Sequence, residues 1–316
     1  MKKLKTEAEL SHEKVLQIAE HLDPGHVAAF WNFVHERHEI YRRRFLEKLP
    51  APWTEDPVLQ KFFFTNVYRQ LDKGTIYYVD NVLNHENAAE DFFETLVYRQ
   101  FNNWRTYEFM KSFRKPGDWQ NWQGIATRLI EYGHENNTNI FTDAHMTTGV
   151  KWGGYDNKPF NVCWMLHLHW RNLSTVFGWV MGAASLKERH GFIAGLQGFG
   201  PFLAYEVVTD MNYAVHLNPN GFTEDDWANP GPGCRKAIDL MILPHTIDIT
   251  YESVMRTLRV LQYEYFTALE IPFNYLEGQY DLSLRNIEHS LCEYYKYDRA
   301  KRTGKARRKY RLGGRG

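Results

Sequence analysis

Residues 186–208, LKERHGFIAGLQGFGPFLAYEVV, contain the signals of two helices joined by a tight turn. The first helix is predicted to end near Gly195, and Pro201 suits the first turn of the second helix. Between them stands Gly198-Phe199-Gly200, a large apolar residue between two glycines. We expect Phe199 to fill the space between the helices, while the glycines let backbone N–H groups approach an anion such as a phosphate. The stretch therefore predicts a helical hairpin, either a plain structural one or one that binds phosphate.

Helix signals recur along the rest of the chain. Asp23-Pro24 and Asp56-Pro57 each combine an N-cap residue with a proline at the first helical position. Apolar residues at helical spacing predict helices over residues 24–45, 57–71, 88–103, 119–134, 160–185, 250–270 and 284–302. Residues 136–159 and 218–232 are rich in small and polar residues, which indicates loops, the first with a short strand as the alternative. The sequence therefore predicts an all-α fold with long loops.

The size of the chain allows one large domain or two small ones. It has 316 residues, of which 43% are hydrophobic and 24% charged, so it can bury a substantial core. We expect an N-terminal helical part over residues 1–115, a part with the hairpin over residues 116–302, and a basic tail over residues 303–316. The first two parts forming one continuous domain is the alternative.

Several classes of protein are excluded. Residues 172–185, the most apolar uncharged stretch near the middle of the chain, are too short and too mixed in composition to span a membrane. The first five residues, MKKLK, lead into charged residues rather than an apolar signal core. Cys163, Cys234 and Cys292 are too far apart for a disulfide framework or a zinc knuckle, and they suit a reducing compartment. We therefore expect a cytoplasmic protein without a membrane partner.

The net charge of zero conceals an uneven distribution of charge. Residues 296–316 carry ten Lys and Arg and one Asp, about +9, so the first 295 residues carry about −9. Glycines at positions 304, 313, 314 and 316 indicate a flexible segment. Such a segment is either a solubility tail or a contact for a polyanion such as nucleic acid.

Six segments, taken in order, resemble one known family. They are RHEIYRRR (37–44), PWTEDPVL (52–59), FTNVYRQLD (64–72), GFG (198–200) with Asp210, GPGCR (231–235) and IEHSLCEYYKYDR (287–299). Together they are similar to the phage thymine-hypermodification family. This family comprises the α-glutamyl/putrescinyl thymine pyrophosphorylases, also called amino acid:DNA transferases, and the helical domain of 5-hydroxymethyluracil DNA kinases. The resemblance extends over about residues 27–302, and the hairpin resembles the helix-hairpin-helix of DNA glycosylases.

The resemblance implies a helical, DNA glycosylase-like fold and a reaction on DNA. A hydroxymethyluracil base carrying a pyrophosphate ester would lose pyrophosphate to an amine or hydroxyl of an amino acid or polyamine. The implied partners are double-stranded phage DNA with activated hydroxymethyluracil, the small donor, and the DNA kinase of the same pathway, in the host cytoplasm during infection. The chain contains no G-x-x-x-x-G-K-[ST] phosphate-binding loop, which favours the transferase branch over the kinase branch.

The same resemblance implies which residues bind the pyrophosphate or the DNA phosphates. Arginine suits phosphate because its planar guanidinium offers paired hydrogen bonds. A solvated helix face with surface ion pairs, or a plain loop turn at the glycines, is the competing interpretation. The candidates are Arg37, Arg43, Asn66, Arg69, Gly198, Gly200, Gly231, Gly233, Arg235 and Lys296.

The helix predicted near the C-terminus carries two rows of polar residues. Glu288 and Cys292 form one row, and His289, Glu293 and Lys296 form the other. Glu288 or His289 is a candidate base for removing the proton of the incoming amine, with a buried structural network as the alternative. Cys292 either adds to the uracil ring or packs as a small core residue.

Two acidic residues complete the candidate site. Asp210 follows the hairpin, as a catalytic acidic residue does in the glycosylases, and we count it as a third catalytic candidate. Asp226 is a candidate ligand for Mg²⁺ beside the pyrophosphate, or a solvated loop residue. No other metal or cofactor is expected.

Two other functions compete with the transferase. A DNA glycosylase would release a free base and leave an abasic site. A non-catalytic helper of a hydroxymethyluracil DNA kinase would bind the duplex without turnover.

Overall fold

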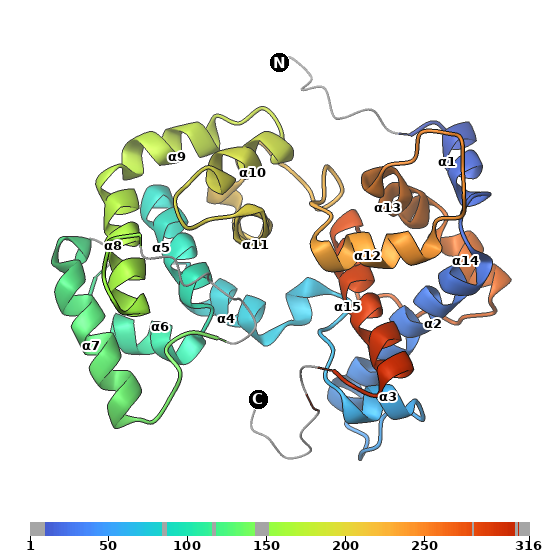
Figure 1. The fold of residues 1–316 in the computed structure, drawn as a ribbon, viewed down its shortest axis with the longest axis horizontal. Helices are drawn as coiled ribbons and strands as arrows, with labels where there is room; N and C mark the ends of the chain where they lie inside the picture. Colours follow the sequence, from blue (N-terminus) through green and yellow to red (C-terminus); the bar gives the residue numbers. More distant parts are fainter. Residues whose placement is uncertain are drawn as a thin grey trace. The chain divides into compact units, whose positions relative to one another are not determined.

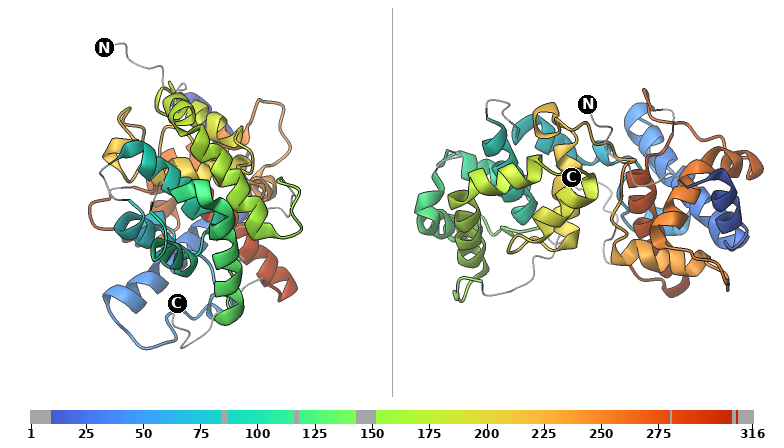
Figure 2. Two further views of the ribbon diagram at one scale, coloured as in Figure 1. Left: turned by 90° about the vertical axis from the view of Figure 1, so that its left-hand side faces the viewer. Right: turned by 90° about the horizontal axis from the view of Figure 1, so that it is seen from above.

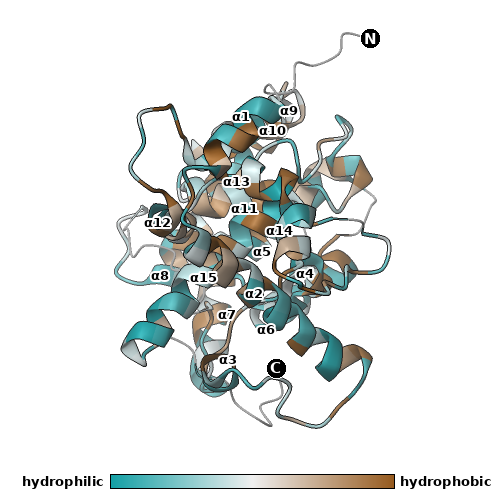
Figure 3. Cartoon of the chain, turned by 90° about the vertical axis from the view of Figure 1, so that its right-hand side faces the viewer, coloured by the Kyte–Doolittle hydropathy of each residue, from teal (hydrophilic) through white to brown (hydrophobic). Residues whose placement is uncertain are grey.

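The computed structural model describes residues 10–83, 87–115, 118–142, 152–279, 281–306 and 309. Over these residues the regular structure is helical, and β-structure is limited to two isolated bridges. This confirms the all-α prediction. Among the described residues, no helix is long and apolar enough to cross a membrane. Figure 3 shows instead that most helices carry both hydrophilic and hydrophobic residues, as amphipathic helices do.

The chain folds into two compact units (Figure 1). The inserted unit comprises Lys73–Asp226, and the terminal unit comprises Lys5–Asp72 and Trp227–Gly316. This division differs from the expected parts 1–115 and 116–302, because helices on both sides of residue 116 pack together within the inserted unit. Of the expected basic tail at 303–316, only residues 303–306 and 309 lie within the described part.

The inserted unit is built around a central helix, α5. Its helices are α4 (Lys73–Asn81), α5 (Ala88–Phe101), α6 (Trp104–Lys111), α7 (Trp122–Glu135), α8 (Lys158–Arg171), α9 (Leu173–Met181), α10 (Leu186–Ala194) and α11 (Pro201–Met211), with short 3₁₀ turns at Asp118–Asn121 and Val215–Leu217. Every residue of α5 from Asp91 to Phe101 is buried, and α6, α8, α9 and α11 all contact this helix. Figures 1 and 2 present the unit from three directions.

The terminal unit is built around the last helix, α15. Its helices are α1 (His12–Ala19), α2 (Pro24–Tyr41), α3 (Pro57–Lys61), α12 (Pro232–Met241), α13 (Tyr251–Val260), α14 (Gln262–Ala268) and α15 (Leu284–Thr303). A π-helical turn at Arg42–Leu46 extends α2, and a 3₁₀ turn spans Arg69–Leu71. α15 packs against α2, α3, α12 and α13. A β-bridge between Leu22 and Ile242 also joins the first segment of this unit to the second.

The predicted helix starts are confirmed at atomic detail. Asp23 accepts a hydrogen bond from the His26 N–H at 2.8 Å, and Pro24 is the first residue of α2. Asp56 likewise accepts hydrogen bonds from the N–H groups of Val58 and Leu59 at 2.7 and 2.9 Å. Each carboxylate satisfies N–H groups that the first helical turn leaves without a partner.

The hairpin is also as predicted. Gly195 follows α10, α11 begins at Pro201, and Phe199 is completely buried between them. Gly198 has φ +85°, and a Cβ there would lie 2.0 Å from the Met165 sulfur, so the position requires glycine on both counts.

Three predicted helices are wrong in extent. The helix expected over 57–71 ends at Lys61, because Phe62 turns extended and pairs with Lys309 in a β-bridge. The helix expected over 160–185 breaks at Asn172 into α8 and α9, and that expected over 250–270 breaks at Leu261 into α13 and α14.

Candidate functional site

The candidate residues divide between the two units. The inserted unit holds Asp210, Gly198, Gly200 and Asp226. The terminal unit holds Arg37, Arg43, Asn66, Arg69, Gly231, Gly233, Arg235, Glu288, His289 and Lys296.

In the terminal unit, a chain of hydrogen bonds links α2 to the extended segment after α3. Arg37 donates through Nε to the Phe64 carbonyl at 3.0 Å and through Nη2 to Asn66 Oδ1 at 2.7 Å. The Asn66 backbone N–H donates to Asp72 Oδ1 at 3.2 Å. Arg37 and Arg69 are both buried. The structure thus brings together three of the predicted phosphate ligands, Arg37, Asn66 and Arg69.

The second polar row of α15 meets the same segment. His289 Nε2 lies 2.7 Å from Thr65 Oγ1, and the Thr65 backbone N–H donates to Glu293 Oε2 at 3.2 Å. Lys296 Nζ donates to Glu293 Oε1 at 2.5 Å. His289 is half-buried and Lys296 is exposed. We call the set of Arg37, Thr65, Asn66, Arg69, Asp72, His289, Glu293 and Lys296 the His289 cluster.

The carboxylates of the His289 cluster have opposite pKa shifts. Burial raises the pKa of Asp72 to about 6, against the lowering effects of Arg69 and Arg37. Burial also opposes the ionisation of Glu293, but Lys296 and His289 outweigh it and lower its pKa. Three cationic residues and two acidic ones thus give the cluster a net charge of about +1 at neutral pH, with His289 counted as neutral.

Arg43 makes its contacts elsewhere. It lies in the π-helical turn, and its Nη1 donates to Glu36 Oε1 at 3.1 Å and to the Trp53 carbonyl at 2.7 Å. These partners occupy the guanidinium with intramolecular bonds. Its assignment as a phosphate ligand stays a prediction.

The first polar row of α15 faces the start of α12. The Gly231 N–H donates to Glu288 Oε1 at 3.3 Å, and Arg285 Nη1 donates to Glu288 Oε2 at 2.6 Å. A Cβ at Gly233 would lie 2.5 Å from Cys292 Sγ. Both glycines therefore allow α12 and α15 to pack closely. Both carboxylate oxygens of Glu288 already accept hydrogen bonds within the protein.

Cys292 and Arg235 have structural partners at this interface. Burial raises the pKa of the Cys292 thiol to about 12, so it stays protonated at neutral pH and is a poor nucleophile. This placement favours packing over addition to a base. Arg235 donates through Nε to the Pro230 carbonyl at 2.8 Å, and its guanidinium lies 5.5 Å from the ring centre of Tyr251.

In the inserted unit, Asp210 belongs to a buried ion pair. Arg99 of α5 donates to both of its oxygens, from Nη2 at 2.6 Å and from Nε at a shorter distance, and Glu206 lies 3.6 Å from Arg99. Asp210 is completely buried. This geometry favours a structural role in joining α5 to α11, and the catalytic assignment of Asp210 stays a prediction.

In the turn of the hairpin, two carbonyl groups are held by side chains of neighbouring helices, whereas Gly200 is exposed to solvent. The carbonyl oxygens of Gln197 and Gly198 lie 2.8 Å from His169 Nε2 and Gln100 Nε2, respectively. Gly200, the N-cap of α11, is exposed and has open space where a Cβ would point. The exposed start of α11 is therefore compatible with a phosphate at this place.

Asp226 caps a loop turn. Its Oδ2 accepts a hydrogen bond from the Thr223 N–H at 2.7 Å. Within the described ranges, no group of three or more His, Cys, Asp and Glu side chains gathers in a geometry suited to a metal. Mg²⁺ binding by Asp226 stays a prediction.

Two partners of the candidate residues are not evident from the local sequence. Thr65, which contacts both His289 and Glu293, has no local signal, because its partners are more than 220 residues away. Arg99, the partner of Asp210, lies in a helix whose buried side carries charge and therefore lacks a clean apolar stripe.

The fold and these clusters define a helical protein with polar residues of α15 at the centre of the terminal unit. The chain belongs to the family described as "5-hmdU DNA kinase, helical domain", whose profile matches residues 25–306. It is also 29% identical over 287 residues to the 5-hmdU DNA kinase of Bacillus phage SP10. That alignment covers 85% of this chain and 44% of the kinase, so the chain spans less than half the length of this relative. No solved structure gives a significant match.

Proposed function

We propose that this chain is a DNA-base-modifying transferase of thymidine hypermodification. It displaces pyrophosphate from 5-pyrophosphoryloxymethyluracil in DNA with an amino acid or a polyamine. The observation that carries the proposal is the His289 cluster, in which the segment Thr65-Asn66 contacts a half-buried histidine through Thr65 and a buried arginine, Arg37, through Asn66. Glu293, which also contacts Thr65, holds the exposed Lys296.

The cluster has the groups that such a displacement needs. The amine nitrogen attacks the exocyclic methylene carbon, a C–N bond forms, and the C–O bond to pyrophosphate breaks with the electron pair leaving on oxygen. Cationic side chains stabilise the charge that develops on the leaving pyrophosphate. The proton lost by the amine passes to His289 Nε2, which lies at the half-buried face of α15.

His289 is a better base in this proposal than Glu288. Both oxygens of Glu288 already accept hydrogen bonds, from Gly231 and Arg285. Loss of the Arg285 contact would leave a buried cation without its partner, which is costly. His289 Nε2 lies 2.7 Å from a neutral hydroxyl, that of Thr65, and an incoming amine can take the place of this contact without leaving a buried charge exposed to the interior.

The relatives support a substrate in DNA. The family and the phage relative are both named for a 5-hmdU DNA kinase, an enzyme named for hydroxymethylated deoxyuridine in DNA. The exposed start of α11 at Gly200 and the basic residues after α15 supply further contacts for phosphate.

The second candidate function is a DNA-binding helper of a hydroxymethyluracil DNA kinase. It is favoured by the alignment, which pairs this chain with 44% of a kinase. It predicts duplex binding without chemistry. A glycosylase has less support, because the Asp210 carboxylate is held by Arg99 inside the unit.

The test is nucleoside mass analysis after incubation with DNA that carries the pyrophosphorylated base. A pool of amino acids and polyamines is supplied, with and without Mg²⁺. The transferase predicts a new nucleoside with the mass of thymidine plus the donor minus two hydrogens. Unchanged DNA despite binding would favour the helper, and loss of the base would indicate a glycosylase.

The role of His289 is tested with His289→Ala and a matched control, His12→Ala. His12 is an exposed residue of α1 in the same unit. Loss of a general base is expected to lower the transfer rate by about 10²–10⁴-fold while DNA affinity is retained. Equal rates for the two variants would exclude His289 as the base.

A further inference from the structure

An exposed aromatic ring lies beside the His289 cluster. Phe63 belongs to the extended segment after α3, two residues before Thr65, and it is 40% exposed. Its neighbours Phe62 and Phe64 are almost completely buried. Successive side chains of an extended segment point to opposite sides, so the segment packs Phe62 and Phe64 inward and presents Phe63 to solvent.

Contacts on both sides of Phe63 fix its place in the terminal unit. The ring centre of Phe64 lies 6.0 Å from that of Tyr297 in α15, and the residue after Phe64 already belongs to the His289 cluster. In the other direction, Phe62 pairs with Lys309 in a β-bridge. Phe63 is therefore held between the His289 cluster at one end and a residue of the basic tail at the other.

The elements on either side of this ring are positively charged. From Lys296 to Thr303, α15 carries four cations and one acidic residue, Asp298, which Arg302 holds at 2.7 Å. Lys61 on α3 and Arg299 on α15 are exposed, and neither pairs with an acidic side chain in the described part of the chain. Because α3 and α15 pack against each other (Figure 1), these cations flank the segment that carries the exposed ring.

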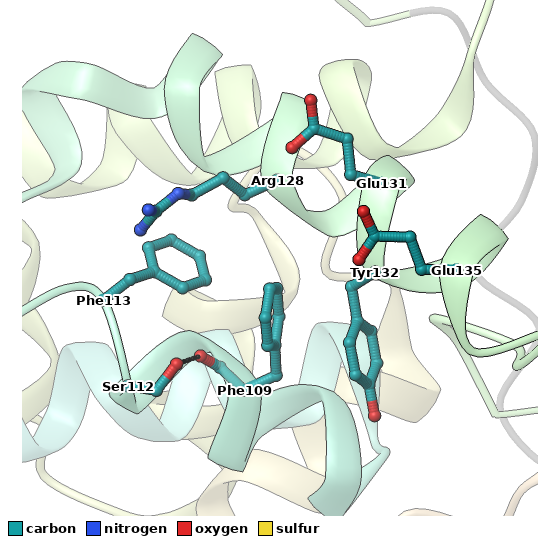
Figure 4. A pocket seen from close by; sticks show the side chains of 7 residues that line it. All are labelled: Phe109, Ser112, Phe113, Arg128, Glu131, Tyr132 and Glu135. Carbon is teal, nitrogen blue, oxygen red and sulfur yellow. Dashed lines mark hydrogen bonds between the residues drawn. The ribbon is translucent and has the colours of Figure 1, made fainter.

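A second group of aromatic rings has the opposite charge around it. A pocket of about 440 Å³ between α6 and α7 of the inserted unit contains Phe109 stacked on Tyr132, with ring centres 4.2 Å apart (Figure 4). Glu131 and Glu135 outnumber the one arginine that lines this pocket. A polyanion such as DNA is therefore disfavoured there, whereas the cations that flank Phe63 attract it.

We infer that the segment at Phe63 binds an unpaired stretch of DNA strand, with one base stacked on the Phe63 ring. Every base has a π face, so stacking accepts all four bases, and the site distinguishes an unpaired strand from a paired one without reading sequence. Lys61, Arg299 and Lys309 supply positive charge for the phosphates on either side of the stacked base.

The position of the ring connects this binding to the chemistry proposed above. Phe63 and Thr65 are roughly 6.6 Å apart along an extended backbone, so a base on Phe63 is held close to His289. A base that has left the duplex loses its pairing and stacking partners, and the ring replaces part of that loss. The inference rests on the proposed function for the role of this base, but strand binding itself requires no transfer and is measured without it.

The test is fluorescence anisotropy of the full chain with labelled, unmodified DNA. The probes are a single strand, a fully paired duplex and a duplex with a short central run of mismatches. The unaltered chain is expected to bind the mismatched duplex more tightly than the paired one. Phe63→Leu keeps an apolar side chain but removes the ring, so it is expected to weaken the mismatched duplex and the single strand about fivefold or more and to leave the paired duplex unchanged. Phe63→Trp keeps a ring and is expected to retain the preference.

The matched control is Phe45→Leu. Phe45 is 45% exposed and belongs to the same unit, but it lies in the π-helical turn, where the Arg44 guanidinium is 4.7 Å from its ring centre. Its substitution is expected to leave the affinity for all three probes unchanged.

Three results would overturn the inference. One is equal affinity of the unaltered chain for the paired and mismatched duplexes. Another is an equal effect of Phe63→Leu and Phe45→Leu on the mismatched duplex. The third is an equal loss of affinity in Phe63→Trp and Phe63→Leu, since that would mean that the ring is not what binds. A preference for the mismatched duplex that depends on Phe63, together with no new nucleoside in the mass analysis, would support strand binding and refute the transfer alone.

Discussion

The Arg99–Asp210 pair allows a structural role and a catalytic role of Asp210 to be separated. The substitution Asp210→Asn keeps the shape of the side chain but removes its charge, which leaves Arg99 buried beside a neutral amide. Loss of one partner of a buried ion pair costs about 3–5 kcal/mol. Glu206 lies 3.6 Å from Arg99 and still balances part of its charge in the variant. The expected loss of unfolding free energy is therefore at the lower end of this range, about 3 kcal/mol.

This loss is large enough for a simple measurement. For a unit of about 150 residues, each kcal/mol lowers Tm by roughly 2–4 °C, so Asp210→Asn is expected to lower the Tm of the inserted unit by about 6–12 °C. Thermal unfolding followed by circular dichroism measures this shift. Asp80→Asn is the control, because Asp80 is an exposed residue of α4 in the same unit.

The outcome that would refute this reasoning is specific. If Asp210→Asn unfolds within about 2 °C of the unaltered chain, the pair does not hold α5 and α11 together. A variant that keeps its Tm but loses transfer activity would instead support the catalytic assignment of Asp210.

Five further substitutions test the glycine contacts and one buried histidine. Gly198→Ala is expected to destabilise the chain by about 2 kcal/mol or more, because the alanine would need a positive φ and its Cβ would clash with the Met165 sulfur. Gly200→Ala, where a Cβ meets open space, is expected to keep the Tm and to weaken duplex DNA binding in a filter or anisotropy assay. Gly233→Ala is expected to cost about 1–3 kcal/mol in chemical denaturation, and the added change Cys292→Ala should recover most of it by removing the sulfur in the way. Burial among aromatic rings lowers the pKa of His38 to about 4, below its unfolded value of about 6.5, so stability is lost as pH falls from about 6.5 to 4. His38→Phe should remove up to about 3 kcal/mol of that loss, and an unfolding series across this pH range that is the same for both proteins would contradict the assignment.

Local signals of the sequence predicted much of the fold. The caps at Asp23 and Asp56 and the hairpin around Gly198 depend on residues within a few positions of one another. The start of α12 at Gly231-Pro232 carried the same kind of proline signal, but its short length and the surrounding loop residues concealed the helix.

Interactions between distant residues explain where the prediction fails. Residues 62–68 carry apolar residues at helical spacing, yet the backbone N–H groups of Thr65 and Asn66 find side-chain acceptors instead of a helical turn. One acceptor, Glu293, is 228 residues away. No window of sequence contains both partners of such a contact.

The candidate site was predictable only where its residues lie close together in the sequence. The two polar rows of α15 follow from the spacing of a single helix, and the structure directs them to two different surroundings. Which loop each row would meet was not predictable, because it depends on how α2, α12 and α15 pack in the terminal unit.

The insertion of one unit into the other has a consequence for synthesis. All of Lys73–Asp226 leaves the ribosome before α15 begins at Leu284, so the inserted unit can fold while α2 still lacks its central partner. At 5–20 residues per second, roughly 10–50 s pass between the synthesis of α2 and that of α15. During this time Phe30 and Phe33 of α2 lack the rings of Tyr294 and Tyr297 that they contact in the folded chain. During that interval the nascent chain is most exposed to aggregation, and a chaperone that protects α2 would raise the yield of folded protein more than one that acts on the inserted unit.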